Sequence, residues 1–298
     1  MIKTKKALKI LGQGCIVLLL ALGAFKSYDF YKENKLERSK SKKLQVNTSQ
    51  KPFVILISAH NNSIYCEKSL FSVITQNYQN FRVLYIDDAS TDDSFLKVSL
   101  MASQSVQRDK ISFLQNKETK GSLACLYEAI ATCQDHEIVL LVDGNDFLAH
   151  ENVLSKLNKV YSKPSTWMTY GNFLDYPSYR QIPIKCKQIP KNVIFNNSFR
   201  SYELQEVHLK TFYAALFKQI RKEDLLYKGR FLSADGTLAY FLPLLELAGK
   251  HASFVNEVLY LHTRSHPPLS QECLSHIQKL PKYKRLKTLF TTEQETGI

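Results

Sequence analysis

The chain has 298 residues, of which 44% are hydrophobic, and it contains 17 Phe and 16 Tyr. This length and apolar content are enough to bury a core, and they argue against a disordered chain. The formal net charge of +13 is concentrated at the two ends, because residues 1–50 hold eleven basic and three acidic residues and residues 279–298 hold five basic and two acidic residues. The nearly neutral middle argues against a protein that binds nucleic acid along a basic groove.

The N-terminal region contains an apolar run, Ile10–Phe25, with basic residues on both sides. As a helix it would extend about 24 Å at ~1.5 Å per residue, which is short of the ~30 Å hydrocarbon core of a bilayer. Lys9 and Lys26 can extend toward the two interfaces and close part of that gap. We expect residues 1–26 to be a membrane anchor. A cleaved signal peptide is the alternative, because Leu22-Gly23-Ala24 offers small residues near the end of the run.

Basic residues are more frequent after this run than before it, since four precede it and seven follow before position 44. The positive-inside rule then predicts a single-pass membrane protein whose folded part lies in the cytoplasm. Residues 27–51 are polar and rich in Ser and Lys, which is typical of a solvated linker.

From Pro52 onward, short apolar runs alternate with helix-length stretches. Phe53–Ser58 (FVILIS) is a continuous apolar run, as expected for a strand buried on both faces. The alternation predicts further strands at Phe81–Ile86, Ile111–Leu114, Ile138–Val142 and Trp167–Tyr170, and helices at Glu67–Thr75, Ser94–Ser103, Leu123–Cys133 and Val153–Tyr161. Four such βα units predict an α/β fold with a doubly wound, mostly parallel, Rossmann-like sheet.

Beyond Asn172 this regularity fails. Residues 173–205 are rich in Pro, Tyr and Asn, so we expect loops or a lid there. Helical patterns return at Lys210–Ile220 and Thr237–Ala248, and a strand is predicted at Ala252–Leu261.

Polar and acidic residues follow three of the predicted strands. They form the segments Ser58-Ala59-His60-Asn61-Asn62, Asp87-Asp88-Ala89-Ser90-Thr91 and Asp143-Gly144-Asn145-Asp146. Ligands of open α/β sheets bind at the carboxyl ends of the strands, so we expect these segments to lie at one edge. No GxGxxG or GxxxxGK[ST] loop follows the first strand, which disfavours a dinucleotide or P-loop site.

An acidic edge can hold an anionic diphosphate only through a divalent cation, and carboxylate and amide oxygens suit Mg²⁺ or Mn²⁺. For either acidic segment alone, a turn or a helix N-cap is an equal alternative.

Two long segments resemble the family 2 inverting glycosyltransferases. The run FVILISAHNNSIYCEKSLFSVITQNYQNFRVLYIDDASTDDSF resembles the family's first strand, its SVxxQxYxNF helix exit and its IDDxSTDxS strand end. The segment NKETKGSLACLYEAIATCQDHEIVLLVDGNDF resembles the helix and strand that lead to the family's DxD motif. The resemblance implies a GT-A domain at residues 52–266, followed by a basic C-terminal tail at residues 267–298.

The resemblance also implies a reaction and its ligands. The expected enzyme is hexosyltransferase-like and moves a sugar from a nucleotide-diphosphate donor, most readily a UDP-sugar, to a hydroxyl of a saccharide or lipid-linked acceptor, with Mg²⁺ or Mn²⁺ as the cofactor. In bacteria such donors are made in the cytosol, which agrees with the predicted topology. Together with the anchor, this points to the synthesis of a cell-surface polysaccharide or a glycolipid.

The family's functional positions map onto this chain residue by residue. The residues implied to bind the donor are Ala59, His60, Asn61, Asp87, Asp88 and Asp143, with His262 and Arg264 near the diphosphate; the implied metal ligands are Asp143, Asn145 and Asp146. Asn145 departs from the family, because the second DxD position usually holds an acid. An amide oxygen still ligates a hard cation but contributes no charge. His208 has no assigned chemistry and is expected to be a core or capping residue.

The segment GRFLSADGTLAYFLPLLELAGKHASFVNEVLYLHTRS matches the family's region of the catalytic base, and Asp235 occupies the base position. A helix N-cap is the alternative role for Asp235. At the level of the whole chain, the alternative is a GT-A-like binding or scaffolding domain that has lost catalysis, motivated by Asn145. A nucleotidyltransferase is disfavoured, because its Gly-rich turn after the first strand is missing.

Overall fold

The computed structural model describes residues 50–290, apart from residues 180–185, 205, 233–236 and 264–269. The chain divides into two units, Met1–Thr48 and Ser49–Ile298, and all of the described residues belong to the second. The predicted anchor and most of the predicted linker lie outside the described residues. Within the described ranges, none of the helices has the length and apolar character that a membrane span requires.

The described residues form an eight-stranded sheet with the order β3-β2-β1-β4-β7-β6-β10-β5 and a separate hairpin, β8–β9. The strands are β1 Phe53–Ala59, β2 Phe81–Asp87, β3 Ile111–Gln115, β4 Ile138–Asp143, β5 Phe147–Leu148, β6 Met168–Asp175, β7 Thr211–Tyr213, β8 Leu226–Tyr227, β9 Arg230–Phe231 and β10 Ala252–His262. The pairs β1–β2, β1–β4, β2–β3 and β6–β10 are parallel. The predicted α/β fold with a mostly parallel sheet is therefore confirmed.

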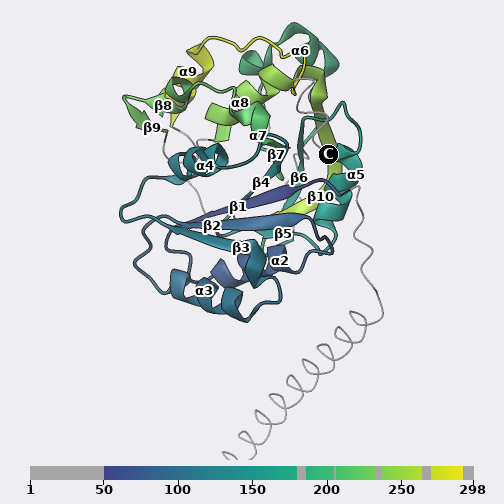
Figure 1. Cartoon of the computed structure of the whole chain (residues 1–298). Coiled ribbons are helices and arrows are strands. Elements are labelled where there is room, and N and C mark those ends of the chain that lie inside the picture. The colour runs from purple at the N-terminus through teal and green to yellow at the C-terminus, as the bar shows by residue number, and fades with distance from the viewer. Residues whose placement is uncertain (1–49, 180–185, 205, 233–236, 264–269, 291–298) are drawn as a thin grey trace, which may run out of the picture. The chain divides into compact units, whose positions relative to one another are not determined.

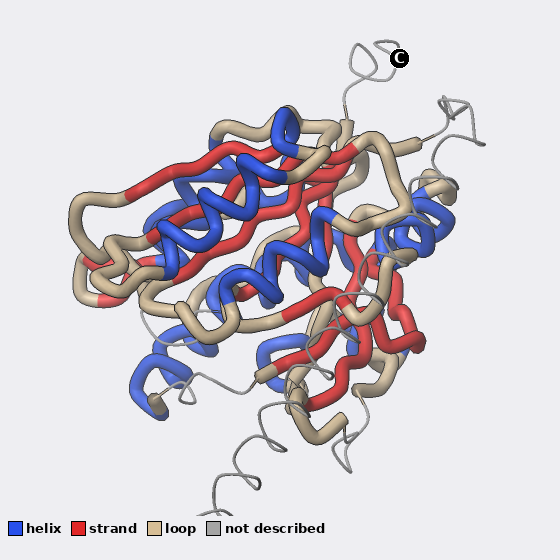
Figure 2. Tube along the Cα trace, turned by 90° about the horizontal axis from the view of Figure 1, so that it is seen from below, coloured by secondary structure: helices blue, strands red, loops and turns tan. Residues whose placement is uncertain are grey.

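Helices cover both faces of the sheet. They are α2 Cys66–Ile74, α3 Ser94–Gln104, α4 Ser122–Ala131, α5 Val153–Tyr161, α6 Lys191–Asn196, α7 Ala214–Phe217, α8 Thr237–Ala248 and α9 Gln271–Lys279. Figure 1 shows α2 and α3 on one face and α4, α7 and α8 on the other. From below, helices of the first layer lie in front of the strands (Figure 2). The sheet is thus buried between two layers.

Two apolar clusters, one for each face, form the core. Side chains of β1 alternate between them: Val54 and Leu56 belong to one cluster, whereas Phe53, Ile55 and Ile57 belong to the other. All five are at most 1% exposed. The continuous apolar run of this strand follows from its burial on both faces.

The helix predicted at Lys210–Ile220 is wrong. Thr211–Tyr213 form β7, which pairs antiparallel with both β4 and β6, and only Ala214–Phe217 are helical. The Thr211 hydroxyl lies 2.8 Å from the Tyr161 hydroxyl and 2.6 Å from the Thr169 hydroxyl. The pairing with two neighbouring strands outweighs the helical tendency of this stretch. The local sequence pattern gives no information about these two partners.

Part of the region expected to be loop is regular, because β6 continues to Asp175 and α6 spans Lys191–Asn196. At the C-terminal end, α9 and the residues after it pack against α8. The backbone N–H of Leu286 donates to the carbonyl of Leu247 at 3.0 Å. The segment predicted as a basic tail therefore contributes contacts to the folded unit within residues 270–290.

Candidate active site

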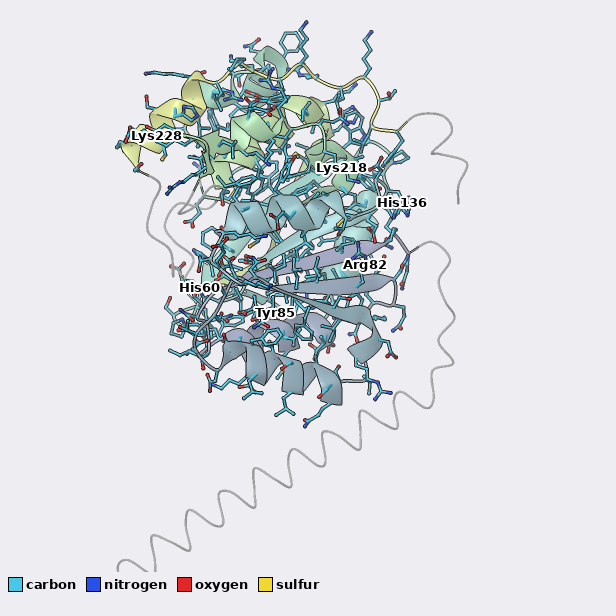
Figure 3. All side chains as sticks on the ribbon, turned by 60° about the vertical axis from the view of Figure 1, so that its left-hand side comes forward. His60, Arg82, Tyr85, His136, Lys218 and Lys228 are labelled. Atoms are coloured by element: carbon cyan, nitrogen blue, oxygen red, sulfur yellow. The ribbon has the colours of Figure 1, made fainter. Side chains whose placement is uncertain are left out.

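The polar segments after β1, β2 and β4 lie at one edge of the sheet. In the parallel register, Ala59 is opposite Asp87 and Ser58 is opposite Asp143. The N–H of Asp88 continues this pairing by donating to the carbonyl of Ala59 at 2.8 Å. In Figure 3, His60 marks this edge, whereas Arg82 and His136 lie toward the opposite end of the strands. The predicted convergence of the three strand ends is confirmed, while the ligands of these residues remain a prediction.

The turn after β1 is held by the turn after β2. The His60 imidazole is 2.7 Å from the carbonyl oxygen of Asp88, to which Nδ1–H donates. Asn61 adopts a left-handed conformation with φ of 49°, which Asn tolerates better than most residues. Its Oδ1 accepts from the N–H of Thr91 at 2.7 Å, and its own N–H donates to the Ser90 hydroxyl at 2.9 Å. These contacts make the two turns a single unit.

Asp88 is 3% exposed and anchors the segment that leads into α4. Its carboxylate accepts from the Asn116 amide at 2.8 Å, from the N–H of Lys120 at 2.9 Å and from the N–H of Gly121 at 2.7 Å. Burial alone would raise the pKa of Asp88, but these hydrogen bonds outweigh it and place the pKa below its usual value. Asp88 is therefore ionised at neutral pH and positions the start of α4, besides the nucleoside contact that the resemblance implies.

Asp87 is 1% exposed, and its two oxygens differ in their environment. Oδ2 accepts from the Gln115 amide at 3.2 Å. Among the described residues, Oδ1 has no hydrogen-bond donor. A buried carboxylate oxygen without a donor is energetically unfavourable.

The turn after β4 carries the residues at the DxD position. The N–H of Asn145 donates to Asp143 Oδ1 at 3.0 Å, and the Asn62 amide donates to the carbonyl of Gly144 at 2.7 Å. A Cβ at position 144 would lie 2.7 Å from both the Cβ of Ala59 and Nδ2 of Asn62. Only glycine fits between the first and fourth strands at this point.

We expect Gly144→Ala to lower the free energy of unfolding by about 1–3 kcal/mol, because the added methyl group overpacks the strand edge. Urea unfolding measures this change. A second substitution, Ala59→Gly, removes one of the two clashes and should restore part of the loss. An unchanged free energy of unfolding in Gly144→Ala would contradict the tight packing between Gly144 and the end of β1.

Asp146, predicted as a metal ligand, faces β10 in this structure. It is 1% exposed. Its Oδ2 accepts from Nδ1 of His262 at 2.9 Å, and its Oδ1 accepts from the N–H of Thr263 at 2.8 Å. Nε2 of His262 lies 3.3 Å from a carboxylate oxygen of Glu206. His262 is thus held between two carboxylates.

The charges of this group follow from its contacts. Burial alone would lower the pKa of His262, but Asp146 and Glu206 outweigh it and raise the pKa to about 9. His208 stacks on His262 with ring centroids 4.6 Å apart, and burial lowers the pKa of His208 to about 4. At neutral pH the group therefore contains one imidazolium, one neutral imidazole and two carboxylates. Because two carboxylates face its single positive charge, His262 supplies little positive charge to a diphosphate.

Two sets of side chains near this edge resemble metal sites. Asp146, His208 and His262 offer ligand atoms that all lie within 4.8 Å of one another. A metal-bound histidine must be unprotonated, and the raised pKa of His262 opposes this at neutral pH. The turn after β4 offers other oxygen ligands, because Asp143 and Asn145 carry a carboxylate and an amide, which suit Mg²⁺ and Mn²⁺.

Sequence reasoning found some members of this site and missed others. Asp235 and Arg264 lie outside the described residues. Glu206 was missed, because an acid in an irregular segment carries no pattern that links it to a distant histidine. His208, which the sequence suggests only as a core or capping residue, lies with its ring against both His262 and Tyr260.

Two solved structures with similar folds contain bound nucleotide sugars. S. aureus TarS 1–349 in complex with UDP-GlcNAc has a TM-score of 0.55 and 19% sequence identity, over 73% of this chain and 60% of that chain. The mannosyltransferase PcManGT from Pyrobaculum calidifontis in complex with GDP-Man and Mn²⁺ has a TM-score of 0.51 and 16% identity, over 80% of this chain and 66% of that chain. These likenesses show that the chain shares the fold of both proteins.

The family model for glycosyl transferase family 2 matches residues 54–226, and the chain belongs to this family. GlyG of Streptococcus pneumoniae is 22% identical over 222 residues, which are 70% of each chain. An uncharacterized glycosyltransferase of Haemophilus influenzae is 28% identical over 119 residues, which are 40% of this chain and 46% of that relative. The match to the Haemophilus protein thus spans about half of its length.

Proposed function

We propose that this chain is an active, inverting GT-A glycosyltransferase that transfers a sugar from a nucleotide-diphosphate donor to an acceptor hydroxyl. The observation that carries the proposal is the convergence of Asp87, Asp88 and Asp143 at one sheet edge, in a chain whose family match covers three of the strands that form this edge. Two structural neighbours are complexes with UDP-GlcNAc and GDP-Man, both of which are nucleotide sugars.

Each group of residues has a separate role in the proposed reaction. The turn after β1 and the carboxylates of Asp87 and Asp88 at the end of β2 would bind the nucleoside. A divalent cation bound by Asp143 and Asn145 would neutralise charge on the diphosphate. Asp235 would take the proton of the acceptor hydroxyl while its oxygen attacks the anomeric carbon from the face opposite the diphosphate.

Nucleotide binding tests the proposal directly. Calorimetry with UDP and GDP should show binding that requires Mn²⁺ or Mg²⁺. Asn145→Asp adds a charged ligand, so we expect about tenfold tighter cation-dependent binding, whereas Asp143→Asn should weaken it by a similar factor. The matched control is Asp109→Asn, a surface carboxylate that is 92% exposed. No heat of binding for either nucleotide with Mn²⁺ present would refute the proposal.

One observation favours a second function. Asn145 removes a charge from the DxD position, which is the change expected in a domain that binds nucleotide without turning it over. In that case UDP binds but no UDP is released from any UDP-sugar, with or without acceptor.

The setting of the reaction is part of the proposal. Residues 1–26 would attach the chain to a membrane with the catalytic unit on the cytoplasmic side, and the acceptor would be a saccharide or a lipid-linked molecule in the synthesis of a surface polysaccharide or glycolipid. The support for this is the apolar run and its flanking charges.

A further inference from the structure

A cavity of about 810 Å³ lies beside α4, between this helix, the β8–β9 hairpin and Cys273 of α9. Ala59, Asp87, Asp88 and Asp143 are not among the described residues that line it. The cavity is therefore separate from the strand-end residues to which the donor is assigned, and neither the family match nor the comparisons assign it a ligand.

The charged residues that line the cavity are three basic side chains and one acidic one, Lys120, Lys228, Arg230 and Glu128. Nζ of Lys120 is 2.7 Å from Glu128, and Nζ of Lys228 is 3.2 Å from Glu272. Among the described residues, no acidic side chain lies within ion-pair distance of Arg230, which is exposed. A guanidinium at a cavity wall is suited to bidentate binding of a phosphate or a carboxylate.

Aromatic rings of the same hairpin are held in place by their neighbours. Phe231 packs on Tyr127 with ring centroids 5.5 Å apart. The Tyr227 hydroxyl donates to Glu272, and its ring lies 4.9 Å from that of His276. Both hairpin rings line the cavity and are half-buried. Such rings provide apolar surface for the C–H face of a sugar at little cost in conformational entropy.

Lys120 connects the cavity with the strand-end residues. Its backbone N–H donates to Asp88, while the residue also lines the cavity. In Figure 3, Lys228 and His60 lie on the same side of the molecule. The hairpin is also followed by Leu232, three residues before Asp235 in the sequence. Through Lys120, the cavity is thus next to Asp88 at the donor edge.

We propose that this cavity binds the acceptor and that the acceptor carries an anionic group, a phosphate or a carboxylate. Arg230 and Lys228 bind that group, and Tyr227 and Phe231 contact the adjoining sugar ring. The inference rests on the proposed function, since it names the chemical class of the acceptor for that reaction.

The test compares three soluble probes on the full chain saturated with UDP and Mn²⁺: glucose 6-phosphate, glucuronate and glucose. Ligand-observed NMR titrations should show that at least one anionic probe binds at least tenfold more tightly than glucose. The anionic probe with the higher affinity shows whether the acceptor carries a phosphate or a carboxylate. In the double variant Arg230→Ala/Lys228→Ala this preference should disappear, while UDP affinity stays within about twofold of wild type. The matched control, Lys284→Ala/Lys287→Ala, removes two exposed charges elsewhere and should keep the preference.

Three results would overturn the inference: equal binding of all three probes to the wild type, a preference that survives in the Arg230/Lys228 variant, or loss of UDP binding in that variant, which would assign the cavity to the donor diphosphate. Failure of the proposed function would give a different result, because the wild-type protein would then bind no nucleotide, regardless of whether the three probes bind.

Discussion

Asp235→Asn should lower the rate of sugar transfer by roughly 10²- to 10⁴-fold, because it removes the carboxylate assigned as the general base. The substitution keeps the size of the side chain and leaves every residue of β1, β2 and β4 unchanged. Affinity for UDP in the presence of Mn²⁺ should therefore change by less than about twofold. Release of UDP from a UDP-sugar in the presence of acceptor measures the rate, and calorimetry measures the affinity.

Asp109→Asn serves as the control for this substitution too, and it should transfer sugar at the wild-type rate. Unimpaired transfer by Asp235→Asn would exclude Asp235 as the base. Loss of transfer and nucleotide binding together would instead indicate that Asp235 supports the fold, as a helix N-cap would. If the wild type itself shows no transfer, the inactive binding domain becomes the better description.

Breaking the buried ion pair between Arg200 and Glu246 should destabilise the protein by about 3–5 kcal/mol. The two side chains are 4% and 0% exposed, and their closest N–O distance is 2.7 Å. Arg200 also donates to the carbonyl of Ile277, and Glu246 accepts from the N–H of Tyr283 at 3.0 Å. Glu246→Leu leaves a guanidinium buried without its carboxylate, and urea unfolding measures the cost.

A double-mutant cycle distinguishes the energy of this ion pair from the energy lost when packing contacts are removed. Arg200→Met/Glu246→Leu should be destabilised by less than the sum of the two single changes, because no unpaired charge remains buried. The exposed pair of Lys156 and Glu257 is the matched comparison, and Glu257→Gln should cost at most about 1 kcal/mol. If Glu246→Leu costs no more than Glu257→Gln, the buried pair does not hold the C-terminal segment in place.

Elements with a local signal were predictable from the sequence. The helices predicted at Val153–Tyr161 and Thr237–Ala248 have these bounds in the structure. The strand at Phe53 was predictable because burial on both faces requires an unbroken apolar run. Convergence of the polar strand ends followed from the parallel arrangement, since neighbouring parallel strands end at the same edge.

Elements that depend on distant partners were not predictable. Thr211–Tyr213 lie inside an apolar stretch that suits a helix, and only the open positions between β4 and β6 make them a strand. Likewise, His262 contacts Asp146, which lies 116 positions away in the sequence, and Glu206, which lies in a third segment. Nothing in the spacing of these three residues indicates that they meet.

The reversed direction of β7 has a consequence for where site residues are found. A parallel strand brings the residues after it to the ligand-binding edge, and these residues are the ones that a sequence pattern identifies as site candidates. An antiparallel strand in the same sheet begins at that edge, so it brings the residues before it. Thr211 pairs with Leu140 in the middle of β4, and the N–H of Leu141 donates to the carbonyl of Lys210. The chain before Thr211 therefore lies toward the carboxyl end of β4, and Glu206 and His208 contact His262. In this architecture the segment leading into the reversed strand is a second source of functional side chains, and it can vary without altering any strand-end motif.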